Sequence, residues 1–233
     1  MYKYFISIFL LFMFVDGVCQ EQKKDTLQVP KDSITYKSPY GIRFGVDISK
    51  PILASTTNSY SGFEIVGDYR ISEKFFIAAE FGYEEKTSRE DYTNSTANGS
   101  YIRLGFNYNA YENWLDMNNE IFTGYRYGFS VFDQTLNNYT PNVNTTYFPA
   151  TTILTPTSSN LNAHWSEFMV GLKVETFNNL FVSFSISYKI LMSVKEPEGF
   201  KTLYSPGFNR IFESGTGFGF NYAISYLIPF TKK

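Results

Sequence analysis

The sequence predicts an all-β protein: an eight-stranded antiparallel transmembrane β-barrel connected as an up-and-down meander. Three observations lead to this fold class. Apolar residues alternate with small or polar residues in eight segments, short and long links alternate between the segments, and aromatic residues gather at the segment ends. Most of the segments are roughly nine to eleven residues long, which is the length that a tilted strand needs to cross a bilayer.

The eight alternating segments follow one another from residue 40 to residue 230. They cover residues 40–48, 63–71, 75–83, 102–108, 121–131, 167–175, 182–190 and 217–230. In the last segment, GFGFNYAISYLIPF, every second residue from Phe218 to Phe230 is aromatic or aliphatic. Because successive side chains of a strand point to opposite sides, each segment has one apolar and one mostly polar face.

The links between these segments predict how the barrel is oriented. Short links cover residues 72–74, 112–119 and 178–179, and long links cover 51–61, 84–100, 134–162 and 193–214. Outer-membrane barrels have short periplasmic turns and long external loops. With an even number of strands, both termini are expected on the periplasmic side.

Composition restricts the class further. A chain of 233 residues is most simply one domain, and a net charge of −2 gives no reason to expect a nucleic-acid partner. Phe and Tyr are abundant, with 24 and 19 copies, yet mean hydropathy is only −0.21. This combination fits a barrel, in which only alternate residues face lipid, better than a bundle of apolar helices.

The N-terminal residues indicate export. Lys3 precedes a short apolar run at 4–15, and Gly17 with Cys19 forms a small-x-small pattern. We therefore predict a signal peptide at 1–19, because the apolar run is too short for a membrane-spanning helix. Residues 20–39 are predicted to be a flexible periplasmic tail, and residues 40–230 the outer-membrane β-barrel. Cys19 is the single cysteine, so no disulfide is expected in the mature chain.

A soluble sandwich or lipocalin would also alternate, with its apolar face turned inward. Aromatic residues near the strand ends favour the membrane alternative, since they resemble the girdles found at the two bilayer interfaces. The residues expected at the periplasmic rim are Tyr69, Phe75, Tyr108, Phe177, Phe181 and Phe230, and those expected towards the outer rim are Phe63, Tyr83, Tyr101, Phe129, Phe168, Tyr188 and Phe218. The expected partners are outer-membrane lipids and the barrel-insertion machinery, which would read the strand that ends at Phe230.

The polar face of the strands carries balanced charge. The residues expected to form a lumen charge network are Arg43, Asp47, Glu64, Asp68, Arg70, Glu80, Arg103, Arg126, Glu167, Lys173, Glu175 and Lys189. An eight-stranded barrel is just wide enough for its own side chains to fill it, and buried charges must pair. We therefore expect a plugged lumen instead of an open pore.

Several stretches resemble a known group of proteins. They are GFEIVGDY (62–69), YENWLDMN (111–118), LNAHW (161–165), KEPEGF (195–200), PGFNR (206–210) and GFGFNYAISYLIP (217–229). Together they resemble an uncharacterised family of small Gram-negative outer-membrane β-barrel proteins, with an architecture similar to the OmpA-type eight-stranded barrel. The resemblance implies a cell-envelope barrel and no activity, so no catalytic residue is carried over.

Candidate chemistry is sparse. His164 and Ser166 share the lipid-facing side of one strand and resemble the dyad of lipid A deacylase barrels, in which histidine activates serine, but no orienting carboxylate is evident. With one histidine and no cysteine in the mature chain, neither a metal site nor a cofactor is expected. An acidic patch of Glu84, Glu85, Glu90 and Asp91 is expected in a solvated loop.

The expected role is therefore structural, or that of a porin-like surface scaffold that presents long external loops for adhesion or partner binding. The 134–162 loop carries Tyr139, Tyr147 and Phe148, aromatic residues that could anchor an extracellular ligand. Two alternatives stay open at this point: a lipid-modifying barrel enzyme and a narrow small-solute channel. The sequence does not indicate an oligomeric state.

Overall fold

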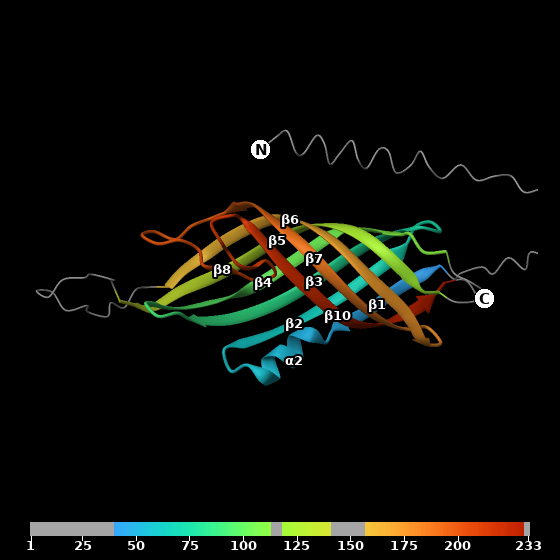
Figure 1. The fold of residues 1–233 in the computed structure, drawn as a ribbon, viewed down its shortest axis with the longest axis horizontal. Helices are drawn as coiled ribbons and strands as arrows, with labels where there is room; N and C mark the ends of the chain where they lie inside the picture. Colours follow the sequence, from blue (N-terminus) through green and yellow to red (C-terminus); the bar gives the residue numbers. More distant parts are fainter. Residues whose placement is uncertain (1–39, 113–117, 141–156, 231–233) are drawn as a thin grey trace, which may run out of the picture. The chain divides into compact units, whose positions relative to one another are not determined.

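The computed structural model describes residues 40–112, 118–140 and 157–230. The chain divides into two units, Met1–Thr35 and Tyr36–Lys233, and all described residues belong to the second. Within that unit, eight strands form a closed antiparallel ring (Figure 1). The predicted signal peptide and periplasmic tail lie outside the described residues.

The wall of the barrel follows chain order. Its strands are β1 (Gly41–Asp47), β2 (Tyr60–Arg70), β3 (Phe75–Arg89), β4 (Thr93–Asn109), β5 (Glu120–Tyr139), β6 (Thr157–Phe177), β7 (Leu180–Val194) and β10 (Thr216–Pro229). Each strand pairs with its neighbours in the chain order of these eight, and β1 closes the ring by pairing with β10. This confirms the all-β, eight-stranded, up-and-down fold class. Closure leaves no strand edge unpaired, which removes the main route to edge-to-edge aggregation.

Three further elements lie in the links. Helix α2 (Ser49–Thr56) connects β1 to β2, and the short strands β8 (Tyr204–Ser205) and β9 (Asn209–Arg210) form a hairpin between β7 and β10. We call the end of the barrel that carries α2, β8 and β9 the mouth, and the opposite end, where β1 begins and β10 ends, the base. Within the described ranges, no helix is both long and apolar enough to span a bilayer.

The strands extend further at the mouth than the sequence pattern indicated. Residues 84–100, expected as a long loop, form a continuous β3–β4 hairpin, with pairing that runs to Arg89 opposite Asn94. The expectation was wrong because we recognised strands by one apolar face, and this segment is polar on both faces. The 134–162 link is also shorter than expected, since β5 reaches Tyr139 and β6 begins at Thr157.

The two faces of the wall differ sharply in polarity. Apolar side chains in mid-strand point outward and stay exposed, for example Val170 (60%) and Ile186 (50%). Charged side chains point inward and are buried, for example Arg103 (2%) and Glu167 (0%). The barrel is therefore the inverse of a soluble sheet protein, which buries its apolar residues and exposes its ions.

Two aromatic residues expected at the rims point inward instead. Tyr101 is 2% exposed and Phe181 is 1% exposed, so neither can face a surrounding medium. Both lie an even number of residues from inward side chains, Tyr101 from Arg103 and Phe181 from Ser185, and strand alternation therefore turns them into the lumen. Nearness to a strand end was the wrong criterion for these two residues.

Candidate functional site

The centre of the lumen is organised around Arg103 on β4. Its guanidinium nitrogens lie 2.6 Å from a carboxylate oxygen of Glu64, 2.7 Å from one of Glu80 and 3.1 Å from one of Glu167. These acids belong to β2, β3 and β6, and none of the four side chains is more than 9% exposed. One cation therefore ties together strands from several sides of the barrel.

A second group of charges lies closer to the base. Arg43 on β1 contacts Glu120 and places its Nε 2.5 Å from Asp68, which also contacts Lys173. The Arg43 guanidinium is 4.6 Å from the centre of the Phe76 ring, close enough for a cation–π contact. These contacts join β1, β2, β5 and β6 across the lumen.

The remaining predicted network residues have different partners. Arg126 joins the central group through Glu80 at 3.2 Å, and Asp47 accepts a 2.8 Å hydrogen bond from the Asn221 amide. Lys189 donates to the carbonyl of Gly207 at 2.6 Å.

Arg70 and Glu175 do not join the interior ion pairs. Arg70 donates to the Ser72 and Glu73 carbonyls, and Glu175 accepts from the Asn118 amide and the Asn179 backbone N–H. Both belong to the turns at the base, because they are the last inward residues before their strands end.

Sequence reasoning missed three charged residues that form ion pairs inside the barrel: Glu120, which pairs with Arg43, and Glu84 and Lys50, which pair with each other. Glu120 was assigned to no strand, yet it has the same parity as the inward Phe122, so extending the alternation by one step would have found it. Glu84 likewise continues the inward series of Glu80 on β3. Lys50 lies on α2, and no local pattern indicates that its side chain enters the barrel.

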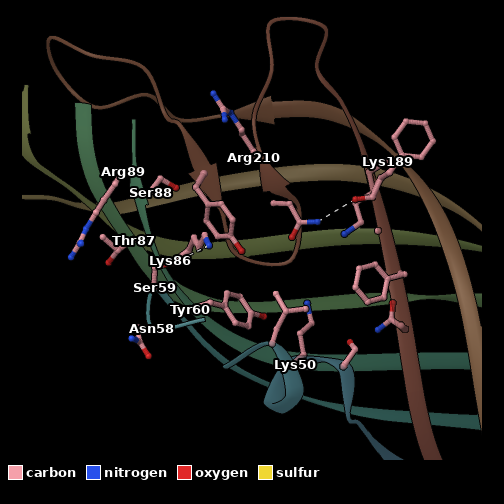
Figure 2. Close-up of a pocket in the computed structure, with 18 of the residues that line it drawn as sticks. Lys50, Asn58, Ser59, Tyr60, Lys86, Thr87, Ser88, Arg89, Lys189 and Arg210 are labelled. Atoms are coloured by element: carbon pink, nitrogen blue, oxygen red, sulfur yellow. Dashed lines mark hydrogen bonds between the residues drawn. The ribbon is translucent and has the colours of Figure 1, made fainter. Parts of the chain in front are cut away.

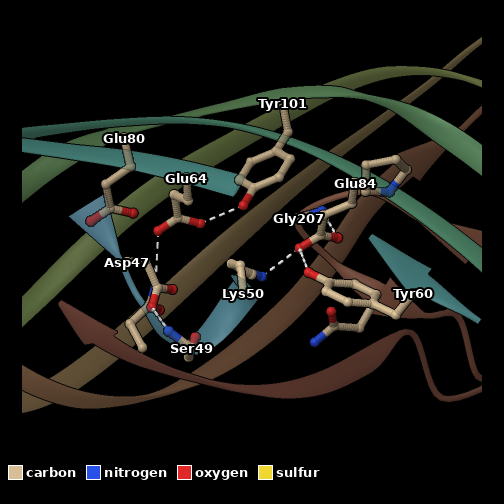
Figure 3. A network of polar contacts seen from close by, with 12 residues as sticks. Asp47, Ser49, Lys50, Tyr60, Glu64, Glu80, Glu84, Tyr101 and Gly207 are labelled. Atoms are coloured by element: carbon tan, nitrogen blue, oxygen red, sulfur yellow. Dashed lines mark hydrogen bonds and ion pairs between the residues drawn. The ribbon is translucent and has the colours of Figure 1, made fainter. Parts of the chain in front are cut away.

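Glu84 is the centre of the polar contacts at the mouth (Figure 3). It contacts Lys50 and accepts hydrogen bonds from the Tyr60 hydroxyl (3.1 Å), the Tyr204 hydroxyl (2.8 Å) and the Gly207 N–H (3.0 Å). Its side chain is fully buried. The prediction that Glu84 belongs to a solvated acidic patch is therefore wrong, whereas Glu85, Glu90 and Asp91 are exposed.

The β8–β9 hairpin closes over this carboxylate. Phe208, at the tip of the hairpin, is fully buried and packs against Trp165 and Tyr101. Its ring centre is 6.0 Å from that of Trp165 in an edge-on arrangement. Gly207 has φ +79°, and a Cβ there would lie 2.6 Å from the Tyr101 ring, so only glycine fits this turn. Much of the 193–214 link, which was expected to be a long external loop, is thus a plug seated in the mouth.

The protonation states of Lys50 and Tyr204 match their contacts with the Glu84 carboxylate. Burial alone would lower the pKa of the Lys50 amine, but the carboxylates of Glu84 and Glu64 outweigh burial and hold the pKa above its usual value. Burial, together with the Glu84 carboxylate, raises the pKa of Tyr204 well above its usual range. Lys50 is therefore a cation and the Tyr204 hydroxyl a hydrogen-bond donor at neutral pH.

His164 and Ser166 lie on the exterior side of β6 but contact different tyrosines. The Nδ1 of His164 is 2.6 Å from the Tyr127 hydroxyl, and the Ser166 hydroxyl is 2.9 Å from the Tyr125 hydroxyl. Trp165, between them, is fully buried in the lumen and is not an interfacial residue.

The candidate loop residues are only partly described. Tyr139 is the last residue of β5 and is half-buried, whereas Tyr147 and Phe148 lie outside the described residues. In the part of the chain that the structure describes, no group of three or more His, Cys, Asp or Glu side chains is arranged to hold a metal ion.

Comparison with known proteins identifies a family and finds structural similarity to solved proteins. No curated protein matches the chain. The crystal structure of Ail, the attachment invasion locus protein of Yersinia pestis, is similar over 82% of this chain and 98% of that chain, with 8% identity and a TM-score of 0.39. A family model described as a domain of unknown function, DUF6048, matches residues 1–233. Since that match spans the whole sequence, the chain belongs to the DUF6048 family.

Proposed function

We propose that the protein is an outer-membrane β-barrel with a lumen plugged by its own side chains and a mouth that serves as a binding surface. The observation that carries the proposal is the inverted polarity of the wall, with apolar side chains outside and ion pairs inside. An exterior of this kind is unstable in water, where large apolar patches cause association, but stable among lipid tails. A signal peptide and periplasmic termini are part of the proposal.

The filled lumen supports a scaffold role over a channel role. Below the mouth, two small cavities lie among the described residues, one of about 50 Å³ beside Arg126 and one of about 20 Å³ beside Glu120. Such volumes suit one or a few water molecules. A larger hollow occurs at the mouth, so binding is the activity that the geometry favours.

The proposal is tested by fractionating cells that express the full chain. We expect the protein in outer-membrane fractions, and we expect unheated samples to migrate differently from boiled samples on SDS gels, because folded barrels resist SDS until they are boiled. Recovery in the soluble fraction with a single unshifted band would refute the membrane assignment. Planar-bilayer recordings with large, stable conductance would refute the plugged lumen.

A charged side chain on the exterior should lower the stability of the barrel only where lipid contacts the strands. Ile186 in mid-β7 and Ile52 on α2 are similarly exposed, at 50% and 54%. Ile186→Lys is expected to lower the free energy of unfolding in lipid vesicles by about 2–4 kcal/mol. Ile52→Lys should change it by less than about 0.5 kcal/mol, because α2 belongs to the link between β1 and β2 at the mouth and not to a membrane-spanning strand. Equal effects of the two substitutions in a urea titration would argue against a bilayer around the strands.

A further inference from the structure

The mouth contains a cavity of about 710 Å³. It is lined by α2, the mouth ends of β2 and β3, the β8–β9 hairpin and the start of β10, with one residue each from β4 and β7 (Figure 2). Its volume falls within the range of ordinary small-molecule sites, roughly 300–1,000 Å³. The cavity is therefore large enough to hold a ligand, unlike the small spaces deeper in the lumen.

Positive charge dominates the lining. The basic side chains come from different elements, and Figure 2 shows several of them around the hollow. They are Lys50, Lys86, Arg89, Arg103, Lys189 and Arg210, and the single acidic residue in the lining is Glu90. A concave surface lined by one sign of charge concentrates ligands of the opposite sign.

Half of these cations are already neutralised by carboxylates. Lys50 contacts Glu84, Arg103 contacts three acids, and Arg210 lies 2.8 Å from Glu90. Their charges are used in ion pairs of the lumen and the mouth, so they contribute little to the attraction of a ligand.

The other three cations have no carboxylate within ion-pair distance among the described residues. Lys86 makes a long hydrogen bond, 3.4 Å, to the Ser59 hydroxyl, and its amine lies 5.9 Å from the centre of the Tyr60 ring. Lys189 is 4% exposed, and its amine donates one hydrogen bond, to the Gly207 carbonyl. Arg89 is exposed at the edge of the cavity. A buried ammonium group can donate three hydrogen bonds, so Lys189 keeps donors for an anion.

The uncharged part of the lining indicates what else the ligand carries. Hydroxyl and amide groups of Asn58, Ser59, Thr87, Ser88 and Asn221 line the cavity. Groups of this kind both donate and accept hydrogen bonds, as sugar hydroxyls do. Tyr60 and Tyr204 also contribute to the lining, and their hydroxyls are bound to Glu84.

We propose that the mouth cavity binds a small anionic saccharide, a sugar that carries a carboxylate or a phosphate, through Lys86, Arg89 and Lys189. The anionic group pairs with these three cations, and the ring hydroxyls bind the polar lining. Charge-assisted hydrogen bonds of this kind are about twice as strong as neutral ones. The inference deepens the binding role proposed above, but it requires only the folded barrel and not its location in the outer membrane.

The test is calorimetric titration of the purified full chain in detergent, with folding checked by its heat-dependent gel mobility. Digalacturonate and glucose 6-phosphate serve as anionic probes, and cellobiose and glucose as their neutral counterparts. We expect at least one anionic probe to bind about tenfold or more tightly than its neutral counterpart, and to weaken as salt is raised. The probe that binds distinguishes carboxylate from phosphate recognition.

The test variant carries both Lys86→Gln and Arg89→Gln. Because these two side chains are accessible and have no carboxylate partner in the described part of the chain, the double variant should still fold. This double variant is expected to bind the anionic probe about tenfold more weakly. The control is Lys201→Gln, an exposed lysine of the β7–β10 link that does not line the cavity, and it should bind like the parent chain. Equal binding of anionic and neutral probes, binding of none, or an unaffected double variant would overturn the inference. A folded protein that binds nothing would leave the membrane proposal intact.

Discussion

Arg103→Met is expected to lower the free energy of unfolding by about 3–5 kcal/mol. Arg103 is the shared partner of three carboxylates that are nearly or fully shielded from solvent. Methionine fills similar volume but supplies no charge, so Glu64 and Glu167 would lose their ion-pair partner in a medium of low dielectric constant, while Glu80 would keep Arg126. The measurement is urea unfolding of the folded barrel in lipid vesicles.

The matched control is Arg210→Met. Arg210 pairs with Glu90 at the mouth, and the two side chains are 60% and 50% exposed. Exposed ion pairs contribute about 0–1 kcal/mol, because water solvates the separated charges almost equally well. If both variants lost the same stability, the central ion network would not be what holds the strands together.

Glu84→Gln is expected to loosen the plug at the mouth. Glutamine keeps the shape of the side chain but carries no charge. The substitution therefore removes the ion pair with Lys50 and weakens the hydrogen bonds that Tyr204 and Gly207 donate. Hydrogen bonds to a charged group contribute about 1.5–3 kcal/mol. A loss of about 2 kcal/mol should raise the exchange rate of the Gly207 amide roughly 30-fold, measured by hydrogen–deuterium exchange.

The next residue provides the control for this experiment. Glu85 lies on the same strand, points outward and is exposed, so Glu85→Gln should change the exchange of Gly207 less than about twofold. The barrel itself should remain folded in both variants, because its ring of strand pairs does not depend on the hairpin. Unchanged exchange at Gly207 in Glu84→Gln would show that Phe208 packing alone seats the plug.

The alternation of residue types was enough to predict the barrel wall. The period of two assigned Arg43, Glu64, Arg103 and Glu167 to the polar face, and the structure places all four inside the lumen. This information is local, because each side chain's direction follows from its neighbours in the same strand. The errors at Tyr101 and Phe181 arose where that rule was set aside for nearness to a strand end.

The limits of the prediction lie at the mouth. There the strands continue with polar residues on both faces, so the apolar signal that marks a strand inside a membrane disappears. The contact between Glu84 and Tyr204 joins residues 120 positions apart, and Lys50 reaches the same carboxylate from a helix. No repeating pattern in the sequence predicts such contacts between distant residues.

The amino-acid pattern thus specified which side of each strand carries apolar residues outward and which side carries ions inward, because pleating alone imposes that choice. The partners of those ions, the seating of the β8–β9 hairpin and the existence of a cationic cavity arise only when distant segments are brought together by closure of the ring. Pairing in a buried network depends on distances across the lumen, and those distances are a property of the folded barrel.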